Sequence, residues 1–418
     1  MSLRDDMTIL ADRAVAASRE LALLNTRKKN AILKAMAGEL DRQSGRILSA
    51  NRGDVEAGRK AGLSPAMVDR LMLDEGRVAA MARGLRDVAA LPDPVGRKLR
   101  SWARPNGLRL VKISVPIGVI AVIYESRPNV TADAAALCFK ASNAVILRGG
   151  SEAIRTSGVI VDVMLEGGMK RGLPGNAIQL VRTADRDAVG ELVRLTGKVD
   201  LAIPRGGEGL IRAVTEQARV PVIKHYKGVC HVYVDESADA DMALRIIENA
   251  KCQRPGVCNA AEKVLVHERI APSFLPGMAA LLSSKGVELR GDAKACAIVP
   301  GMKAAAEQDW HEEYLALIMT VGVVPSVEAA VDHIMKYGSR HSDAIVASSE
   351  AAQEAFVRGV DSAAVYVNAS TRFTDGGEFG MGAEIGISTD KLHARGPMGL
   401  AELTTYKYVV RGNGQVRG

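Results

Sequence analysis

Hydrophobic and polar positions recur with helical spacing through the first ninety residues. Ala, Leu and Met alternate with charged residues over 26–49 and 66–91, which predicts helices. Leu91-Pro-Asp-Pro94 ends this pattern. Asn106-Gly107 then separates residues 101–104 from 108–113, and this dipeptide predicts a β-hairpin because it suits the tight turns between antiparallel strands.

From about residue 115 the pattern changes to strands that alternate with helices. One helix is predicted over 131–141 with Asn129 or Thr131 as its N-cap, and another is predicted from Ser151 to about 165. Strands are predicted over 119–124, 144–148, 177–181, 199–204, 221–223, 231–235, 263–267, 316–324, 343–347, 363–368 and 403–410. This order predicts an α/β fold with parallel strands and helices on both faces, the doubly wound architecture of cofactor-binding domains.

The composition narrows the class of protein. The 418 residues are 47% hydrophobic and 25% charged, as in soluble globular proteins of two or three domains. Only 4% are aromatic, which disfavours a protein that stacks single-stranded bases. Apolar runs are about one strand long, so no membrane span is predicted. Five scattered cysteines without a C-x-x-C pair predict a cytoplasmic protein with neither disulfides nor a metal site.

The net charge of +7 suits either small anions or nucleic acid as partners. Part of it is concentrated in a basic run without acidic residues, made of Arg97, Lys98, Arg100, Arg104, Arg109 and Lys112. Such a run is read as a nucleic-acid patch or as the solvated, oligomer-contacting face of a hairpin. We favour the second reading, because Trp102 is the one aromatic residue near it in sequence.

Two loops carry residues that suit chemistry. In Lys251-Cys-Gln-Arg-Pro-Gly-Val-Cys258, a Pro-Gly turn presents a thiol whose thiolate Lys251 and Arg254 would favour; the alternative is that Cys258 is a small buried hydrophobe. Gly206-Gly207 follows a strand and opens a helix, so it forms either a phosphate-binding turn or an ordinary βα turn. Other polar loops at strand ends, where α/β enzymes bind ligands, include 125–131, 225–228, 337–343 and 368–373.

Several longer segments together resemble the gamma-glutamyl phosphate reductase family of the aldehyde dehydrogenase superfamily, nearly from end to end. They begin at Val115 (Val-Pro-Ile-Gly-Val-Ile), Tyr124 (Tyr-Glu-Ser-Arg-Pro-Asn-Val-Thr), Leu147 (Leu-Arg-Gly-Gly-Ser-Glu), Gln253 (Gln-Arg-Pro-Gly-Val-Cys-Asn-Ala), His341 (His-Ser-Asp-Ala-Ile-Val), Asn368 (Asn-Ala-Ser-Thr-Arg-Phe), Gly382 and His393. The resemblance implies an aldehyde-dehydrogenase-like fold. It also implies reversible, NADPH-dependent reduction of glutamyl 5-phosphate to glutamate 5-semialdehyde, the second step from glutamate to proline.

The resemblance also implies a division of the chain. Residues 1–100 and 116–228 would form the NADP-binding domain, and 229–372 the catalytic domain. Residues 101–115 and 400–418 would form a small β oligomerisation element, and 373–399 would return to the cofactor domain. A homodimer or homotetramer is expected, and a transient contact with glutamate 5-kinase is a further hypothesis; neither nucleic acid nor a membrane is expected as a partner.

Site residues follow from the resemblance one by one. Cys258 matches the nucleophile, and Asn129 matches the side-chain amide that forms the oxyanion hole with the Cys258 N–H. The cofactor-binding matches are Arg148 and Ser151 at the adenosine ribose, Gly206 and Gly207 at the pyrophosphate, and Glu313 at the nicotinamide ribose; a small Ser151 favours NADP. The substrate-binding residues suspected from their positions are Lys227, Arg254, Ser370, Thr371 and Arg372.

One departure from the wider superfamily bears on the reaction. Aldehyde dehydrogenases that make free acids carry a water-activating Glu some 33 residues before the cysteine, whereas this chain reads His225-Tyr-Lys-Gly228 there. A thioester without such a base would survive until phosphate attacks it, as an acyl-phosphate enzyme requires. The alternatives are another semialdehyde dehydrogenase, which acylates CoA or makes an acid, a nucleic-acid-binding protein, and an inactive interaction protein.

Overall fold

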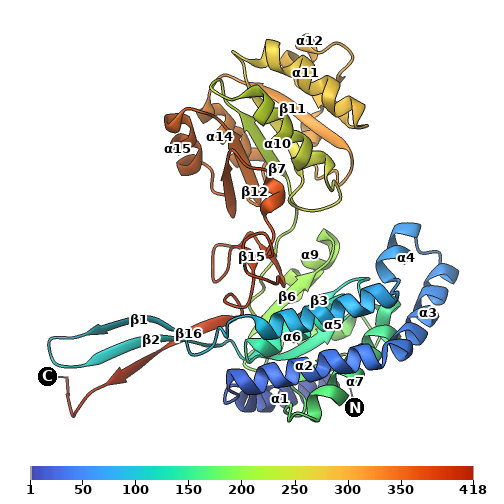
Figure 1. Cartoon of the computed structure of the whole chain (residues 1–418), viewed down its shortest axis with the longest axis vertical. Helices are drawn as coiled ribbons and strands as arrows, with labels where there is room; N and C mark the ends of the chain where they lie inside the picture. Colours follow the sequence, from blue (N-terminus) through green and yellow to red (C-terminus); the bar gives the residue numbers. More distant parts are fainter. Residues whose placement is uncertain (1, 418) are drawn as a thin grey trace. The chain divides into compact units, whose positions relative to one another are not determined.

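The computed structural model describes residues 2–417, which divide into two compact units (Figure 1). Unit 1 comprises residues up to Lys224 together with Gly380–Gly386 and the C-terminal segment from Met398; unit 2 comprises His225–Phe379 and Ile387–Pro397. Residues 373–379 and 387–397 therefore belong to unit 2, whereas the sequence assigned them to a return segment of the cofactor domain. The assignment of functions to domains stays a prediction. Within the described residues, no helix has the length and apolar character needed to cross a membrane.

Unit 1 begins with helices and continues as a parallel α/β layer. Its helices are α1 (Leu3–Leu21), α2 (Thr26–Arg42), α3 (Ser44–Lys60), α4 (Pro65–Leu71), α5 (Glu75–Ala90), α6 (Asn129–Lys140), α7 (Ile154–Met169), α8 (Asp187–Val193) and α9 (Glu208–Gln217). The strands of its parallel sheet are β3 (Val119–Tyr124), β4 (Ala144–Arg148), β5 (Ile178–Leu180) and β6 (Leu201–Arg205). The strand order is β5-β4-β3-β6, so the winding direction reverses beside β3. With right-handed crossovers, α6 and α7 cover one face and α8 the other.

Two capping predictions in unit 1 are wrong. Helix α6 begins at Asn129 itself, and Pro128 precedes it without a side-chain cap, because the fixed φ of proline already suits a helix start. Ser151 does not cap a long helix either. It opens the short 3-10 turn η1 (Ser151–Ala153), and α7 follows from Ile154 to Met169.

A three-stranded antiparallel sheet extends from unit 1. It contains β1 (Lys98–Ala103), β2 (Arg109–Pro116) and β16 (Thr404–Arg411), in the order β1-β2-β16 (Figure 1). The predicted hairpin and C-terminal strand thus pair with each other. The basic run has more aromatic neighbours than the sequence indicated. Strand β16 places the Tyr406 ring with its centroid 3.4 Å from the Lys112 ammonium, and it places Tyr408 beside Trp102.

Unit 2 is built on a seven-stranded parallel sheet in the order β10-β9-β11-β8-β7-β12-β13. The strands are β7 (Cys230–Val234), β8 (Ala261–His267), β9 (Glu288–Gly291), β10 (Lys303–Ala304), β11 (Ile318–Val324), β12 (Ser342–Val346) and β13 (Ala364–Val367). The helices are α10 (Ala240–Cys252), α11 (Ala271–Ser284), α12 (Ala293–Ile298), α13 (Glu307–His311), α14 (Val327–Tyr337) and α15 (Glu350–Gly359), with the turn η2 at Thr371–Phe373. Short strands β14 (Gly386–Ser388) and β15 (Gly396–Met398) pair with each other.

Both faces of the unit 2 sheet are buried. Val232 and Val234 of β7 pack in one hydrophobic core with α10 and α11, while Tyr233 points into a second core with α14 and α15. This is the period of two that a strand imposes on its side chains. The strands consequently read as continuous apolar runs, which is how the sequence signalled them.

Candidate active site around Cys258

Cys258 lies in the loop between α10 and β8, and its side chain is half-buried. A hydrogen bond holds its backbone: the Cys230 thiol donates to the Cys258 carbonyl oxygen at 3.2 Å. Gly228 packs so closely that an added Cβ would lie 1.8 Å from the same oxygen. The loop position of Cys258 therefore depends on a residue without a side chain at 228. The sequence shows this glycine but does not indicate that it packs against the Cys258 backbone.

Lys251, which was predicted to favour the Cys258 thiolate, is paired with a carboxylate. Its ammonium lies 2.7 Å from a carboxylate oxygen of Glu262, and both side chains are fully buried. Burial raises the pKa of Glu262 to about 7, and the charge of Lys251 opposes that rise. The pair joins the last turn of α10 to the start of β8, the two ends of the cysteine loop. Lys251 therefore holds the two ends of the loop together.

Two imidazoles accompany the thiol. One ligand atom each from His225, Cys258 and His341 lie within 4.8 Å of one another, and the two rings meet edge to face at 5.5 Å. His341 is completely buried, which lowers its pKa to about 3 and keeps the ring neutral. Sequence reasoning missed this group, because 33 and 83 residues separate its members and no local spacing brings them together.

A second set of contacts clamps Asn259, the neighbour of Cys258. The Thr371 hydroxyl donates to the Asn259 carbonyl oxygen at 2.7 Å, and Arg372 donates to the Asn259 side-chain oxygen and, at 2.8 Å, to Gln253. The buried Ser370 hydroxyl accepts from the Arg372 N–H. Thr371 is fully buried, and its hydroxyl is used to position the loop. Asn259 is a second positioning residue that the sequence did not single out.

The predicted cations divide between exposed and half-buried positions. Arg254 is exposed, and Lys227 and Arg372 are half-buried. Burial lowers the pKa of Arg372 and the positive charge of Arg254 lowers it further, while the charges of Asp375, Cys258 and Glu378 act in the opposite direction. Arg372 is therefore within electrostatic range of both Arg254 and Cys258. Two guanidinium groups that repel each other beside a thiol form a suitable position for an anion.

Glu313, predicted at the nicotinamide ribose, belongs to the same neighbourhood. Its carboxylate accepts from the Gly228 N–H at 2.9 Å. The segment before β11 that carries it is tied to β8, since Leu315 N–H donates to Glu262 and Lys263 donates to the Glu312 carbonyl oxygen. The same glycine thus contacts both Glu313 and the Cys258 loop.

These unit 2 loops lie at one edge of their sheet. Gly228 precedes β7, Cys258 precedes β8, Glu313 precedes β11 and His341 precedes β12. All four therefore meet at the amino ends of parallel strands. In unit 1, residues 125, 149 and 206 directly follow β3, β4 and β6, so their loops lie at carboxyl ends of strands.

In unit 1, Asn129 lies in the first turn of α6 and donates from Nδ2 to Asp133 at 3.2 Å. Burial raises the pKa of Asp133 to about 6. Asp133 therefore orients the amide that the resemblance assigns to the oxyanion hole. The amide has a second N–H, which this contact does not use.

The Gly206-Gly207 turn already binds a carboxylate. Glu125 accepts from the Gly207 N–H at 2.9 Å, and an added Cβ on Gly206 would lie 2.5 Å from the same carboxylate. Helix α9 starts at Glu208 without a side-chain cap. Anions are favoured at such a helix start, and the exposed Glu125 marks the position where a phosphate would bind.

The two residues predicted at the adenosine ribose differ in how free they are to bind a ligand. Ser151 is exposed at the start of η1. The Arg148 guanidinium is nearly buried and donates to the carbonyl oxygens of Gly149, Ala184 and Asp185. A 2′-phosphate would have to compete with these carbonyl groups for Arg148, so this assignment has the weaker structural support.

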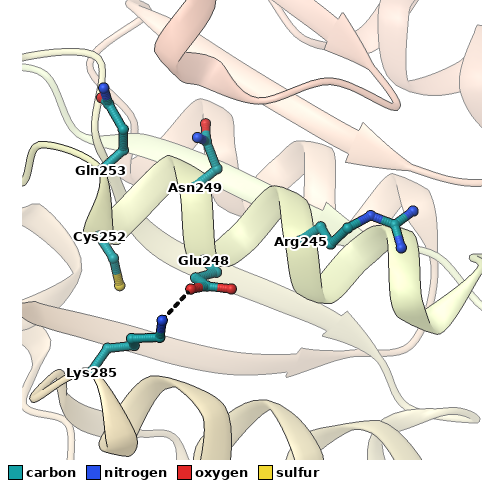
Figure 2. Close-up of a pocket in the computed structure, with 6 residues that line it drawn as sticks. All are labelled: Arg245, Glu248, Asn249, Cys252, Gln253 and Lys285. Carbon is teal, nitrogen blue, oxygen red and sulfur yellow. Dashed lines mark ion pairs between the residues drawn. The ribbon is translucent and has the colours of Figure 1, made fainter.

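A separate pocket of about 460 Å³ lies along α10 (Figure 2). Its lining residues are Arg245, Glu248, Asn249, Cys252, Gln253 and Lys285, and Glu248 pairs with Lys285 at 2.8 Å. Figure 2 shows the Cys252 sulfur beside this ion pair. None of the predicted catalytic or substrate residues lines the pocket.

Cys258 thus lies in the loop between α10 and β8 of an α/β unit, beside two imidazoles. The family model described as "Aldehyde dehydrogenase family" matches residues 2–309, and the chain belongs to this family. Within it, the chain is 55% identical over 417 residues to gamma-glutamyl phosphate reductase of Moorella thermoacetica, with 100% of both chains covered. It is 56% identical over 409 residues to the protein of that name from Rhodopirellula baltica, covering 98% of this chain and 94% of the relative.

Solved structures agree with this placement. The crystal structure of gamma-glutamyl phosphate reductase from Thermotoga maritima superposes with a TM-score of 0.97 at 48% identity, covering 99% of this chain and 100% of that one. An acetylating aldehyde dehydrogenase from Geobacillus thermoglucosidasius shares the fold with a TM-score of 0.69 at 18% identity, covering 100% and 98%. The predicted aldehyde-dehydrogenase-like α/β fold is confirmed.

Proposed function

We propose that the protein reduces L-glutamyl 5-phosphate to L-glutamate 5-semialdehyde and phosphate with NADPH, the second step from glutamate to proline. The full-length similarity to proteins named gamma-glutamyl phosphate reductase supports the substrate. The observation that carries the chemistry is the environment of Cys258, in which Arg372 and Arg254 form a cationic neighbourhood and His225 stands where acid-forming enzymes of the superfamily carry a carboxylate.

In this proposal the Cys258 thiolate attacks the γ-acyl carbon, the C–S bond forms, and the C–O bond to phosphate breaks. Splitting the reaction through a thioester replaces one difficult displacement with two easier ones. The Cys258 N–H stabilises the oxyanion of each tetrahedral intermediate, and one such donor is worth about 3 kcal/mol. Asn129 is the second donor by sequence resemblance. Bound NADPH supplies the hydride that reduces the thioester, after which the thiolate leaves and the semialdehyde is released.

The substrate-holding groups follow from charge and exposure. Arg254 and Arg372 suit the phosphoryl group, and Lys227 suits the α-carboxylate. Ser370 is a further proposed hydroxyl donor, and its oxygen accepts from the Arg372 N–H. Thr371 is retained only as a residue that positions the loop.

The cofactor proposal uses residues of both units. Gly206 and Gly207 would receive the pyrophosphate after Glu125 leaves, Ser151 would leave room for a 2′-phosphate, and Glu313 would hold the nicotinamide ribose. The fit is best at Gly207, whose N–H already binds a carboxylate. Because the Arg148 guanidinium already donates to three carbonyl oxygens, the proposed NADP preference rests on Ser151 more than on Arg148.

The experiment is an NADP-linked assay with glutamate 5-semialdehyde, in the presence and absence of phosphate. We expect oxidation only with phosphate, and we expect Cys258→Ser to abolish it. Cys252→Ser is the matched control, because that thiol lies six residues away in α10. Equal oxidation without phosphate would indicate an acid-forming enzyme, and CoA dependence would indicate an acylating one. A faster reaction with NAD than with NADP would reject the role of Ser151.

The assembly and location complete the proposal. A cytoplasmic homodimer or homotetramer would join through the sheet β1-β2-β16, whose Tyr406, Tyr408 and Val410 are exposed. Exposed aromatic and apolar strand residues support such a contact. Sedimentation of the intact protein and of a Tyr408→Lys variant tests it, and an unchanged oligomer in the variant would reject it.

A further inference from the structure

The group formed by His225, Cys258 and His341 has the composition of a metal site. A thiolate and two neutral imidazoles are ligands that Zn²⁺ accepts, usually in tetrahedral geometry with water or substrate at a fourth position. The ligand atoms lie within 4.8 Å of one another. Bound zinc would need them roughly 3.3–3.6 Å apart, given Zn–S near 2.3 Å and Zn–N near 2.0–2.1 Å.

The outer contacts of His225 suit this use. Its Nδ1 lies 2.9 Å from the carbonyl oxygen of Ile387. A carbonyl only accepts, so Nδ1 carries the proton and, in the neutral ring, the lone pair is on Nε2. Histidine ligands of metals usually donate their other N–H to a carbonyl or carboxylate in this way.

His341 has an equivalent outer shell made of hydroxyls. Its Nδ1 lies 2.9 Å from the Ser342 hydroxyl, which lies 2.6 Å from the Thr374 hydroxyl, and that group lies 2.7 Å from the Tyr366 hydroxyl. When the ring donates from Nδ1 into this chain, its lone pair is on Nε2. Among the described residues, Nε2 of His341 has no hydrogen-bond partner although the ring is fully buried. A buried ring nitrogen of this kind requires an explanation.

We propose that His225, Cys258 and His341 bind a borderline-soft divalent cation such as Zn²⁺, and that this cation reversibly blocks the thiol. Binding forms the S–metal bond and releases the thiol proton to solvent. The coordinated sulfur then no longer attacks an acyl carbon. Cys258 and His225 are half-buried, so rotation of their side chains can close the remaining distance of about 1 Å to tetrahedral geometry.

Local sequence spacing predicted no metal site. Zinc motifs are recognised by ligands a few residues apart, whereas these three precede β8, β7 and β12 from distant parts of the chain. The sheet aligns their strands, and only then do the side chains converge.

The test measures metal binding directly, with no substrate or cofactor present. Chelator-treated, reduced protein is titrated with Co²⁺ and followed by absorption, because tetrahedral cobalt with a thiolate ligand gives intense visible bands and a sulfur-to-metal charge-transfer band. We expect one Co²⁺ per chain, displaced by Zn²⁺. Zn²⁺ affinity is then measured by competition with a chromophoric chelator.

Variants identify the ligands. Cys258→Ser should remove the charge-transfer band, and His225→Gln should weaken Zn²⁺ binding about 100-fold or more, since even outer-sphere partners are worth 10–100-fold. Ser342→Ala, which breaks the contact to His341, should weaken it about tenfold. The controls Cys252→Ser and His311→Gln alter a thiol and an imidazole outside the group and should bind Zn²⁺ like the unmodified protein.

Two results overturn the proposal: an octahedral cobalt spectrum in the unmodified protein, or equal Zn²⁺ affinity of the unmodified protein and His225→Gln. Because His225 is half-buried, its replacement should leave the fold intact, and circular dichroism checks the fold of each variant. The proposal is independent of the reductase reaction, because the cobalt spectrum requires no activity. If the protein is also a reductase, Zn²⁺ inhibits it and a chelator restores it.

Discussion

Asp133 allows the electrostatics of unit 1 to be tested quantitatively. Its side chain projects from α6 and accepts from Asn129, and burial raises its pKa from 3.8 to about 6. The change to test is Asp133→Asn. An amide has nearly the same shape and still accepts from Asn129, but it does not ionise.

The magnitude follows from the two pKa values. A folded pKa of about 6 against 3.8 in the unfolded chain corresponds to 2.2 pH units, or about 3 kcal/mol at 25 °C. The folded protein holds the proton more tightly. The stability that protonated Asp133 contributes is therefore complete below pH 3.8 and is lost as pH rises to 6. The side chain keeps some exposure to water, so we expect a loss of about 1–3 kcal/mol.

The assay compares urea unfolding of the unmodified protein and Asp133→Asn between pH 4 and 8, followed by circular dichroism. The variant should gain about 1–3 kcal/mol over the unmodified protein above pH 6, and the gain should vanish towards pH 4. Asp87→Asn, an exposed aspartate of α5, is the control and should show a constant difference. A pH-independent difference for Asp133→Asn would show that the carboxyl is not held protonated by burial, and the reasoning would fail.

Three further predictions concern the two candidate sites. Gly228→Ala should lower kcat about 100-fold, because its Cβ would lie 1.8 Å from the Cys258 carbonyl oxygen and must displace that loop by about 1 Å; near-normal kcat would show that the loop adapts. Glu125→Gln should tighten NADPH binding about 2–5-fold in fluorescence titrations, since a competing charge leaves the N-terminus of α9; weaker binding would mean that Glu125 helps to hold the cofactor. Glu262→Gln should cost about 3–5 kcal/mol in thermal or urea unfolding by leaving the buried Lys251 unpaired, and K251M/E262Q should recover much of this; equal stability of both variants would contradict the role of the pair.

The regular elements were largely predictable because burial on both faces imposes continuous apolar runs. The strands over 119–124 and 144–148 match β3 and β4 at both ends. The hairpin around Asn106-Gly107 was predictable from turn chemistry alone. By contrast, β9 and β10 are short and partly exposed, and the sequence analysis did not predict them.

The position of β11 between β9 and β8 could not be predicted from the sequence either, because strand order depends on crossovers between distant segments. A run of apolar residues shows that a strand is buried, and it does not identify the neighbours that bury it. The edge at which a loop lies follows from the same order. The loops at residues 125, 149 and 206 therefore lie at carboxyl ends of strands, whereas those at 228, 258, 313 and 341 lie at amino ends.

The sequence by itself determined the α/β class, the family resemblance and the loop that carries Cys258, since these depend on local pattern and contiguous motifs. The tertiary structure decided what surrounds that thiol. It gave Lys251 a buried partner, directed Thr371 into the loop and placed His225 and His341 beside Cys258. The physical reason is that electrostatics and coordination act over a few ångströms in space, and residues 33 or 83 positions apart come within that range only when parallel strands align them.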